Sequence, residues 1–225
     1  MFDRIAPTYD LLNHLLSLGR DFSWRRAAAR ALPCEQDLKV VDLATGTGDL
    51  LLTLLHERPN VTEAVGLDIS EAMLKIGRGK ISRRGLDERI RLVCDDAMHS
   101  ALPTGEFDAA TMAFGIRNTP DVRATLAEIH RLLKPGGTAV ILEFSLPHSA
   151  ILRGFYLVYL RFVVPLLGAL LSGNKGAYRY LNESIEAFYH PDDFCRLMEE
   201  VGFAAVSSIP LTWGVASIYR GRKPD

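Results

Sequence analysis

Cysteine is scarce in this sequence. Only Cys34, Cys94 and Cys195 occur among 225 residues, and they are odd in number and far apart. Neither a disulfide framework nor the ligand spacing of a zinc site can be built from them. We therefore expect no metal site, and a reducing compartment fits this cysteine usage best.

An excess of charge of either sign is also missing. The chain has 26 lysine and arginine residues against 27 aspartate and glutamate residues, and its formal net charge is −1. A protein that binds nucleic acid needs a basic face or stripe, so we expect no nucleic-acid partner. The first residues lack the basic start and the uninterrupted apolar run of a signal peptide, because Asp3, Asp10 and Asp21 interrupt them. We expect a cytoplasmic protein.

A long apolar run without charge is the third absence. Residues 151–172 contain 16 apolar side chains among 22 positions, but Arg153 and Arg161 lie within this segment and Pro165 interrupts it. The longest stretch without charge, residues 162–174, has 13 residues, whereas a membrane-spanning helix needs roughly 20, and an arginine in mid-bilayer is costly. Two interpretations remain: a helix buried in the core, or an amphipathic or hairpin insertion that touches a membrane surface or covers a lipophilic substrate.

What the sequence does contain is a regular alternation of short apolar runs and helical patterns. An apolar run, a glycine turn and a helical pattern open a nucleotide-binding α/β unit. Because this order repeats, we expect a doubly wound, mostly parallel sheet that ends in an antiparallel, hairpin-like pair of strands. The expected strands are residues 38–43, 64–68, 90–94, 107–113, 138–143, 203–209 and 213–220, and the expected helices are residues 4–16, 21–32, 49–56, 71–84, 121–133 and 192–201.

No internal repeat, low-complexity tract or linker divides the chain. We therefore expect residues 1–225 to form a single domain, which is long enough to bury a full core. Within it, residues 1–35 would form a helical lid, and residues 147–185 an apolar helical insertion after the fifth strand.

The turn after the first expected strand carries Gly46 and Gly48, and several classes of cofactor loop use such a pair. The dinucleotide fingerprint needs a third glycine where this chain has Leu51, and a P-loop needs a Gly-Lys-Ser/Thr ending that does not follow here. The remaining pattern, Asp-x-Ala-x-Gly-x-Gly from Asp42, is that of S-adenosylmethionine enzymes. Its glycines let the backbone approach a ligand at positive φ. Asp42 can hold the loop or meet the amino acid end of the cofactor, and Thr47 lies beside it.

Acidic residues end the next two expected strands. Asp68 follows Gly48 by 20 residues, and a carboxylate at that place accepts hydrogen bonds from ribose hydroxyls. Asp96 and Ala97 follow the third strand and are placed to contact the adenine ring. Any one of these acids could be a solvated residue at a strand end. Together with Asp42 and the glycine loop, they favour S-adenosylmethionine as the cofactor.

Three further segments of the chain are distinctive. They are residues 2–13 with Leu16, Ser17 and Trp24, the Phe-Gly-Ile-Arg-Asn of residues 114–118, and residues 131–137, which end in Lys-Pro-Gly-Gly and continue to residues 142–145. With these segments, essentially the whole chain resembles the ubiquinone/menaquinone C-methyltransferases. The third segment is common among class I methyltransferases, whereas the first two are much more specific. The resemblance implies a class I methyltransferase fold and the cofactor contacts Thr47, Asp68, Asp96 and Ala97.

The chain departs from the family pattern at three positions. Leu12 stands where the family usually has methionine, and Asp21 stands where it usually has histidine, three residues before Trp24. Ala113 takes the place of a serine beside the cofactor, so that one side-chain hydrogen bond would be lost there while a backbone contact could survive.

The substrates that the resemblance implies are polyprenylated quinols, with the choice between a benzoquinol and a naphthoquinol left open. A polyprenylated quinol suits the apolar residues 151–172. It also implies that the protein lies at the inner face of the membrane as a peripheral protein. The expected partners are other copies of this chain, in a homo-oligomer, or other proteins of a quinone-biosynthesis complex. Two other interpretations stay open. The acceptor could be another small lipophilic molecule, or the chain could be a non-catalytic assembly factor docked on the membrane.

A quinol carbon becomes nucleophilic when the neighbouring hydroxyl loses or shares its proton, so a base or a cation is expected near it. Our candidates are Arg117 as stabiliser of the phenolate, Asn118 as an orienting residue, and Tyr9 or Asp10 as proton acceptor from the lid. Arg117 and Asn118 could instead form a turn that enters a helix, and Tyr9 and Asp10 could be a packed aromatic residue and a helix cap. His148 and His190, each beside a proline, are weaker candidates.

Overall fold

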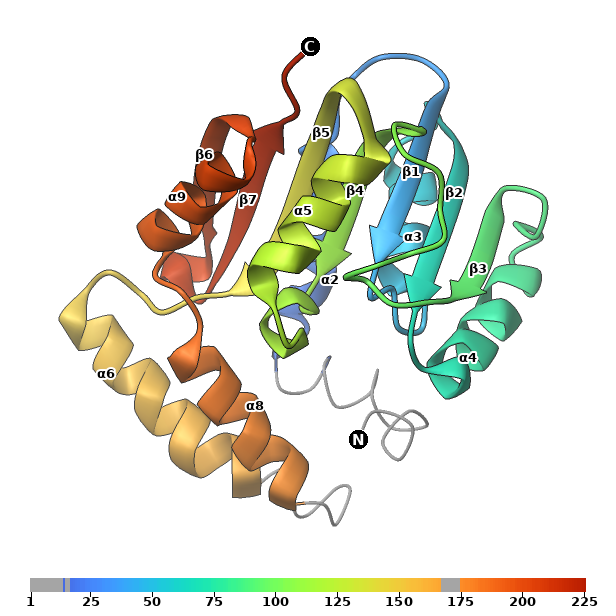
Figure 1. Cartoon of the computed structure of the whole chain (residues 1–225). Helices are drawn as coiled ribbons and strands as arrows, with labels where there is room; N and C mark the ends of the chain where they lie inside the picture. Colours follow the sequence, from blue (N-terminus) through green and yellow to red (C-terminus); the bar gives the residue numbers. More distant parts are fainter. Residues whose placement is uncertain (1–13, 15–16, 167–174) are drawn as a thin grey trace.

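The computed structural model describes residue 14, residues 17–166 and residues 175–225. In this part of the chain, seven strands form one sheet in the order β3-β2-β1-β4-β5-β7-β6 (Figure 1). β1 to β5 pair in parallel, and β7 runs antiparallel to both of its neighbours. The strands are β1 (Leu38–Leu43), β2 (Val61–Asp68), β3 (Ile90–Cys94), β4 (Phe107–Ala113), β5 (Leu133–Phe144), β6 (Ala204–Leu211) and β7 (Ala216–Arg222).

The strand order changes direction between β1 and β4, and this reversal decides where a ligand can bind. The chain moves outward from β1 to β2 and β3, then returns to place β4 on the other side of β1, where Asp42 pairs with Thr111. Loops at the carboxyl ends of β1 and β4 diverge at such a reversal and leave a crevice between them.

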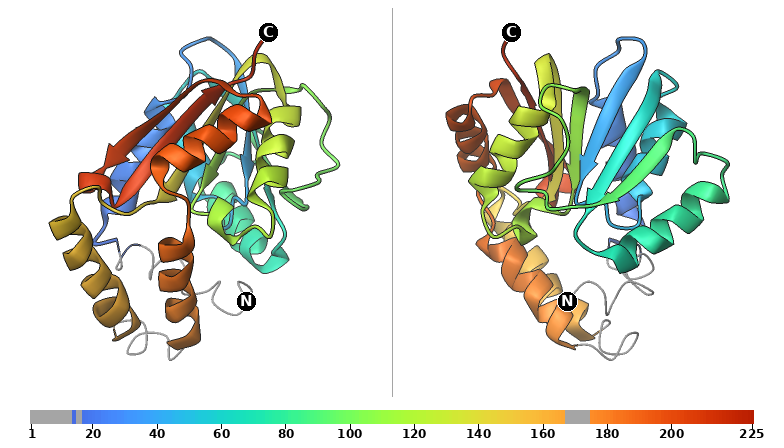
Figure 2. Two further views of the ribbon diagram at one scale, coloured as in Figure 1. Left: turned by 60° about the vertical axis from the view of Figure 1, so that its left-hand side comes forward. Right: turned by 45° about the vertical axis from the view of Figure 1, so that its right-hand side comes forward.

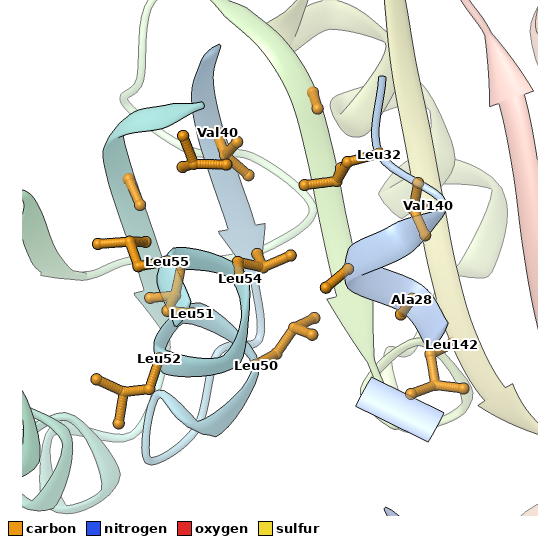
Figure 3. Close-up of a cluster of buried hydrophobic side chains, with 14 of the residues drawn as sticks. Ala28, Leu32, Val40, Leu50, Leu51, Leu52, Leu54, Leu55, Val140 and Leu142 are labelled. Carbon is orange, nitrogen blue, oxygen red and sulfur yellow. The ribbon is translucent and has the colours of Figure 1, made fainter. Parts of the chain in front are cut away.

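Two layers of helices cover the sheet because alternate strand residues point to opposite faces. Val40 packs in a cluster with residues of α2 (Arg20–Arg30) and α3 (Asp49–Glu57), which Figure 3 shows in close-up. Val41 packs in the cluster of the other face with residues of α5 (Val122–Leu132) and α9 (Pro191–Val201). α4 (Glu71–Ser82) follows β2 and begins at Ser70, whose Oγ accepts a hydrogen bond from Met73 N at 3.2 Å.

All seven expected strands and the expected helices from residue 21 onward are present; β1, β3 and β4 have the expected bounds, and the other elements differ from theirs by a few residues. The largest difference is at β5, which begins at Leu133 and not at residue 138, because Leu133 already pairs with Phe107 before the register shifts. The Lys-Pro-Gly-Gly turn therefore ends the helix but lies within the strand. The expected helix at residues 4–16 lies outside the described residues except for residue 14.

The expected insertion after β5 is a pair of helices. α6 (Ala150–Val158) continues through the π-helical turn η2 (Tyr159–Val163), and α8 (Lys175–Ala187) lies beside it beyond the carboxyl ends of the strands (Figures 1 and 2). Arg161 Nε donates to Glu186 Oε1 at 2.9 Å across the pair.

The interpretation of the insertion as a helix buried in the core is wrong for α6. No residue of α6 is buried, and burial begins only at Leu160 and Val164, which pack against Ile185. No helix of the described residues is long and apolar enough to cross a membrane.

Candidate active site

The loop after β1 is held in a left-handed conformation by glycine. Ala44, Gly46 and Gly48 have φ values of 48°, 57° and 79°. A Cβ atom added at Gly46 or Gly48 would meet no atom within 4 Å, so the backbone conformation and not crowding requires glycine there. The two positions leave open space above the loop, which a ligand can approach.

Asp68 joins this loop to the end of β2. Its Oδ2 accepts a hydrogen bond from Gly46 N at 2.8 Å, and its Oδ1 accepts one from Ser70 N at 2.9 Å. Asp96, at the third strand end, accepts a hydrogen bond from Met98 N at 2.9 Å. Both carboxyl groups are therefore fixed in place by backbone donors.

A pocket of about 270 Å³, here called the donor pocket, opens between these strand ends. It lies at the crevice that the reversal of strand order predicts. Six of the residues proposed from the sequence line it together, which are Gly46, Asp68, Asp96, Ala97, Ala113 and Asn118.

Asp42, Thr47 and Gly48 do not line the donor pocket. Asp42 is buried and accepts a hydrogen bond from Thr111 Oγ1 at 2.6 Å, and burial raises the pKa of its carboxyl group to about 7. The hydroxyl of Thr47 accepts a hydrogen bond from Lys80 Nζ at 2.8 Å. These side chains connect the loop to β4 and α4.

A second pocket, of about 280 Å³, lies beside the donor pocket and is here called the acceptor pocket. Its wall is mainly aromatic and aliphatic and comes from α2, the ends of β4 and β5, the helical insertion and the loop before β7. The lining residues include Trp24, Phe114, Phe144, Tyr156, Tyr159, Leu160, Val164, Ile185 and Trp213.

Phe114 lines both pockets. Its φ of 56° is rare for a bulky side chain, and its amide donates to Leu142 O at 2.8 Å. A Cβ atom at the following Gly115 would lie 2.8 Å from Ala44 Cβ, so glycine there lets the loops after β1 and β4 touch. The Phe-Gly pair thus builds the partition between the two pockets.

Arg117 lies behind this partition and lines neither pocket. Its Nη1 contacts Glu143 Oε1 at 2.6 Å and donates to Phe114 O at 2.7 Å, and its Cζ lies 5.1 Å from the centre of the Phe144 ring. Glu143 is fully buried. Burial raises the pKa of its carboxyl group, and the charge of Arg117 opposes that rise. Asn118 Nδ2 also donates to Phe114 O, at 3.2 Å.

The sequence reasoning missed a cluster of polar residues at the start of α2. Asp21 is 2% exposed, contacts Arg25, accepts from Ser17 Oγ at 2.7 Å and lies 2.6 Å from His14 Nδ1. Asp21 and Arg25 lie four residues apart on the expected helix of residues 21–32, and this spacing was the signal that could have revealed the cluster.

The remaining catalytic candidates are less informative. Tyr9 and Asp10 lie outside the described residues. The exposed rings of His148 and His190 lie 5.7 Å apart, away from both pockets. In the described part of the chain, no group of three or more potential ligand residues could hold a metal ion.

The whole chain is similar to known proteins. A model described as the ubiE/COQ5 methyltransferase family matches residues 1–223. A demethylmenaquinone methyltransferase of Thermus thermophilus is 47% identical over 224 residues and covers 100% of both chains. A ubiquinone/menaquinone biosynthesis C-methyltransferase UbiE of Geobacter sulfurreducens is 42% identical over 223 residues, covering 99% of this chain and 87% of the relative.

Among solved structures, a SAM-dependent methyltransferase of Thermotoga maritima matches with a TM-score of 0.65 at 20% identity, covering 99% of this chain and 97% of the other. This likeness concerns the fold and confirms the expected class I methyltransferase architecture. With the family match over nearly its whole length, the chain belongs to the ubiE/COQ5 methyltransferase family and is an enzyme that takes its methyl group from S-adenosylmethionine.

Proposed function

We propose that this enzyme methylates a ring carbon of a polyprenylated quinol, converting a demethylmenaquinol to a menaquinol or carrying out the related benzoquinol step. The observation that carries the proposal is the shared wall at Phe114, which places an apolar, aromatic pocket directly beside the donor pocket. A methyl group has to pass between two molecules held in contact, and two adjoining pockets of different polarity provide that arrangement. The names of the relatives support the quinol as acceptor.

The residues of the donor pocket suit S-adenosylmethionine. Gly46 and Gly48 have positive φ and open space around them, so the backbone of the loop can approach a ligand closely. The carboxylates of Asp68 and Asp96 can accept hydrogen bonds from the ribose hydroxyls and the adenine amino group. Gly46, Thr47, Asp68, Asp96, Ala97 and Ala113 would hold the cofactor, with Asp42 and Gly48 shaping the loop. The cofactor supplies an activated sulfonium methyl group, so the protein mainly aligns the reactants and excludes water.

We propose different roles for Arg117 and Asn118, the two candidates after β4. Asn118 lines the donor pocket and supports the partition at Phe114 O, which fits an orienting role. Arg117 supports the same partition from behind. Direct contact of its guanidinium with a phenolate would require it to leave Glu143, so we propose that Arg117 positions Phe114 and Phe144.

We further propose that the enzyme takes its substrate from a membrane surface and is peripheral at its inner face. One side of α6 and η2 lines the acceptor pocket with Tyr156, Tyr159 and Leu160, and the other side is apolar and exposed. The exposed apolar residues are Ile151, Phe155, Val158, Phe162 and Leu166, which recur at helical spacing. Apolar patches of this kind mark sites that contact membranes or partners.

The mouth of the acceptor pocket supports the same proposal. Leu18 and Trp213 line the pocket and are nevertheless 75% and 78% exposed. An isoprenoid tail could leave the pocket between such side chains without contacting polar groups. The exposed side of α6 and this mouth would then face the same lipid.

The test is a direct assay. Purified protein is supplied with labelled S-adenosylmethionine and, in parallel, with a short-chain demethylnaphthoquinol, a short-chain demethylbenzoquinol and a lipophilic phenol that is not a quinol. Transfer of label to a quinol carbon supports the proposal and names the ring. Transfer only to the phenol would replace the quinol by another lipophilic acceptor. Binding of neither donor nor acceptor in calorimetric titration would favour a non-catalytic assembly role.

A further inference from the structure

The turn between β6 and β7 brings a tryptophan to the mouth of the acceptor pocket. This turn is η3 (Thr212–Gly214), and Trp213 lines the pocket although it is 78% exposed. We propose that Trp213 is a specificity residue whose indole packs against the isoprenoid tail of the acceptor where the tail leaves the pocket. Prenylated acceptors would then bind more tightly than the bare ring. This inference rests on the proposed quinol acceptor and adds the residue that recognises its tail.

Backbone strain is concentrated around the acceptor pocket. Seven non-glycine residues of the described chain have positive φ, and four of them line this pocket, which are Leu18, Phe114, Thr212 and Trp213. Positive φ is a true outlier for a β-branched or bulky side chain. Such conformations persist only where the surrounding structure holds them, and they cluster at sites that clamp ligands. The distribution of strain therefore points to a function for this wall.

Three successive residues of η3 have positive φ. The values are 45° at Thr212, 58° at Trp213 and 91° at Gly214, and only glycine adopts them without a steric cost. Asparagine or a second glycine would form the same turn more easily than tryptophan does. Because the indole is largely exposed, it adds little packing energy to the fold. Folding alone therefore does not explain a tryptophan at this place.

Neighbouring segments hold η3 in its strained conformation. From α2, Trp24 Nε1 donates to Thr212 Oγ1 at 2.8 Å. After the end of β5, Ser145 Oγ donates to Gly214 O at 2.8 Å. A Cβ atom added at Gly214 would lie 3.2 Å from Pro147 Cα, so the turn also packs closely on the segment that leads to α6. These contacts fix the place from which the central side chain of the turn leaves the backbone.

The acceptor pocket has a buried wall and an exposed mouth. Phe114, at the wall shared with the donor pocket, is buried, whereas Leu18 and Trp213 are largely exposed. The ring carbon that receives the methyl group has to lie at the shared wall. Pockets that enclose a whole drug-sized ligand measure roughly 300–1,000 Å³. A pocket of about 280 Å³ can hold the ring of the acceptor but not a polyprenyl tail as well, so the tail leaves through the mouth.

An isoprenoid tail matches the chemistry of the two side chains at the mouth. The tail is a branched hydrocarbon without hydrogen-bonding groups, and the face of an indole and the side chain of a leucine are apolar surfaces that it can cover. Leu18 also leaves a strained backbone, with a φ of 51°, just before Gly19 at the start of α2. Two separate segments thus present an exposed apolar side chain to the same opening, where contact with the tail removes apolar area from water.

The first experiment compares two acceptors that share one ring. Kinetics are measured with a demethylated quinol that has no tail and with the same quinol carrying two isoprenoid units. Glycine keeps the turn, so Trp213→Gly should not lower the Tm. It should reduce the preference for the tailed acceptor, as the ratio of the two kcat/KM values, roughly tenfold. Trp213→Phe, which keeps an aromatic ring, should retain most of the preference.

The matched control relieves a positive φ elsewhere. Ala205 on β6 has a φ of 50° and lines neither pocket. Ala205→Gly should leave the preference for the tailed acceptor at the wild-type value. If Trp213→Gly changed kcat/KM equally for the two acceptors, or changed neither, Trp213 would be only a structural residue of the turn and the proposal would be overturned.

The second experiment needs no quinol. The chain has two tryptophans, and Trp24 is buried, so the fluorescence that differs between the wild type and Trp213→Phe comes from Trp213. A prenyl alcohol of two isoprenoid units should shift this emission to shorter wavelength and saturate. No shift would overturn the contact with a tail, and a shift with lipid vesicles alone would assign the indole to the membrane instead. A saturable shift in an enzyme that methylates no quinol would refute the proposed function but support the prenyl contact.

Discussion

The ring of Phe114 lies 4.6 Å from the ring of Phe144, with an angle of 35° between their planes. Phe114 lines both the donor and the acceptor pocket, whereas Phe144 lines only the acceptor pocket. Each ring also has a guanidinium over it, Arg25 at Phe114 and Arg117 at Phe144. The two rings form one partition, but only one of them can influence how the donor binds.

This difference predicts separable kinetic effects. Phe144→Leu should raise KM for the quinol several-fold and leave the Kd of S-adenosylmethionine unchanged. Phe114→Leu should raise both, and should also lower kcat by roughly 10- to 100-fold, because a small misplacement of reacting groups is costly. Steady-state kinetics and calorimetric titration of the donor measure both quantities. Equal effects of the two variants on donor affinity would contradict the assignment of the pockets.

Asp68 is expected to govern donor affinity. Asp68→Asn removes the charge that receives ribose hydroxyls and weakens the bond to Gly46 N, at a cost of about 1.5–3 kcal/mol for a charged hydrogen bond. The Kd of S-adenosylmethionine should therefore rise roughly 10- to 100-fold. The exposed Asp87→Asn is the matched control, since Asp87 lies far from the donor pocket. An unchanged Kd in Asp68→Asn would remove this residue from the site.

Asp42 should make stability depend on pH with an unusual sign. Its carboxyl pKa is raised from 3.8 to about 7 by burial, so the folded protein binds an extra proton between these values. The free energy of unfolding contributed by this group is fully present below about pH 4 and is lost as the pH rises toward and above 7. If the whole pKa shift is coupled to folding, Asp42 contributes about 4 kcal/mol to the free energy of unfolding at low pH.

Urea unfolding at pH 5 and pH 8 tests this expectation. The loss of stability between the two values should be smaller in Asp42→Asn than in the wild type, because the amide cannot titrate and can still accept from Thr111. Identical losses in the two proteins would show that Asp42 is ionised in the fold at both values.

The ion pair between Arg117 and Glu143 should be costly to break on one side. Glu143→Gln leaves the guanidinium buried without its counter-charge, and we expect a loss of about 3–5 kcal/mol in the free energy of unfolding. The exposed pair of Arg196 and Asp193 is the matched control, and Asp193→Asn should cost less than about 1 kcal/mol.

Arg117→Ala should lose turnover while donor affinity is kept. Full turnover in Arg117→Ala would contradict the proposal that Arg117 positions Phe114 and Phe144.

The sequence was informative about the donor side because donor binding depends on local backbone. The glycine loop, Asp68 and Asp96 follow directly from the order of strands and turns, and strand alternation predicted the sheet. The acceptor side depends on contacts between distant segments, such as Trp24 Nε1 donating to Thr212 Oγ1 at 2.8 Å. The position of Arg117 behind Phe144 could not be read from periodicity, since it arises from packing between distant segments that no local pattern encodes.

The exposed side of α6 and η2 leads to the final prediction, which concerns membrane binding. Phe155 and Phe162 are 74% and 68% exposed, and neither lines the acceptor pocket. Replacing both by serine removes apolar area that would enter the lipid interface but leaves the pocket wall intact. The double variant should sediment less with anionic lipid vesicles than the wild type does, while its turnover of a water-soluble, short-chain quinol stays unchanged.

A control comes from exposed apolar residues outside α6 and η2, namely Ile209 on β6 and Tyr189 between α8 and α9. The double change Ile209→Ser with Tyr189→Ser removes exposed apolar area without changing α6 or η2. Vesicle binding should survive in this control, because membrane contact through one side of the molecule depends on where the apolar residues lie and not on their number. If both double variants sedimented like the wild type, α6 would not be the membrane-contacting surface. If both lost binding equally, exposed hydrophobicity in general would account for the association, and the acceptor would have to reach its pocket by another route.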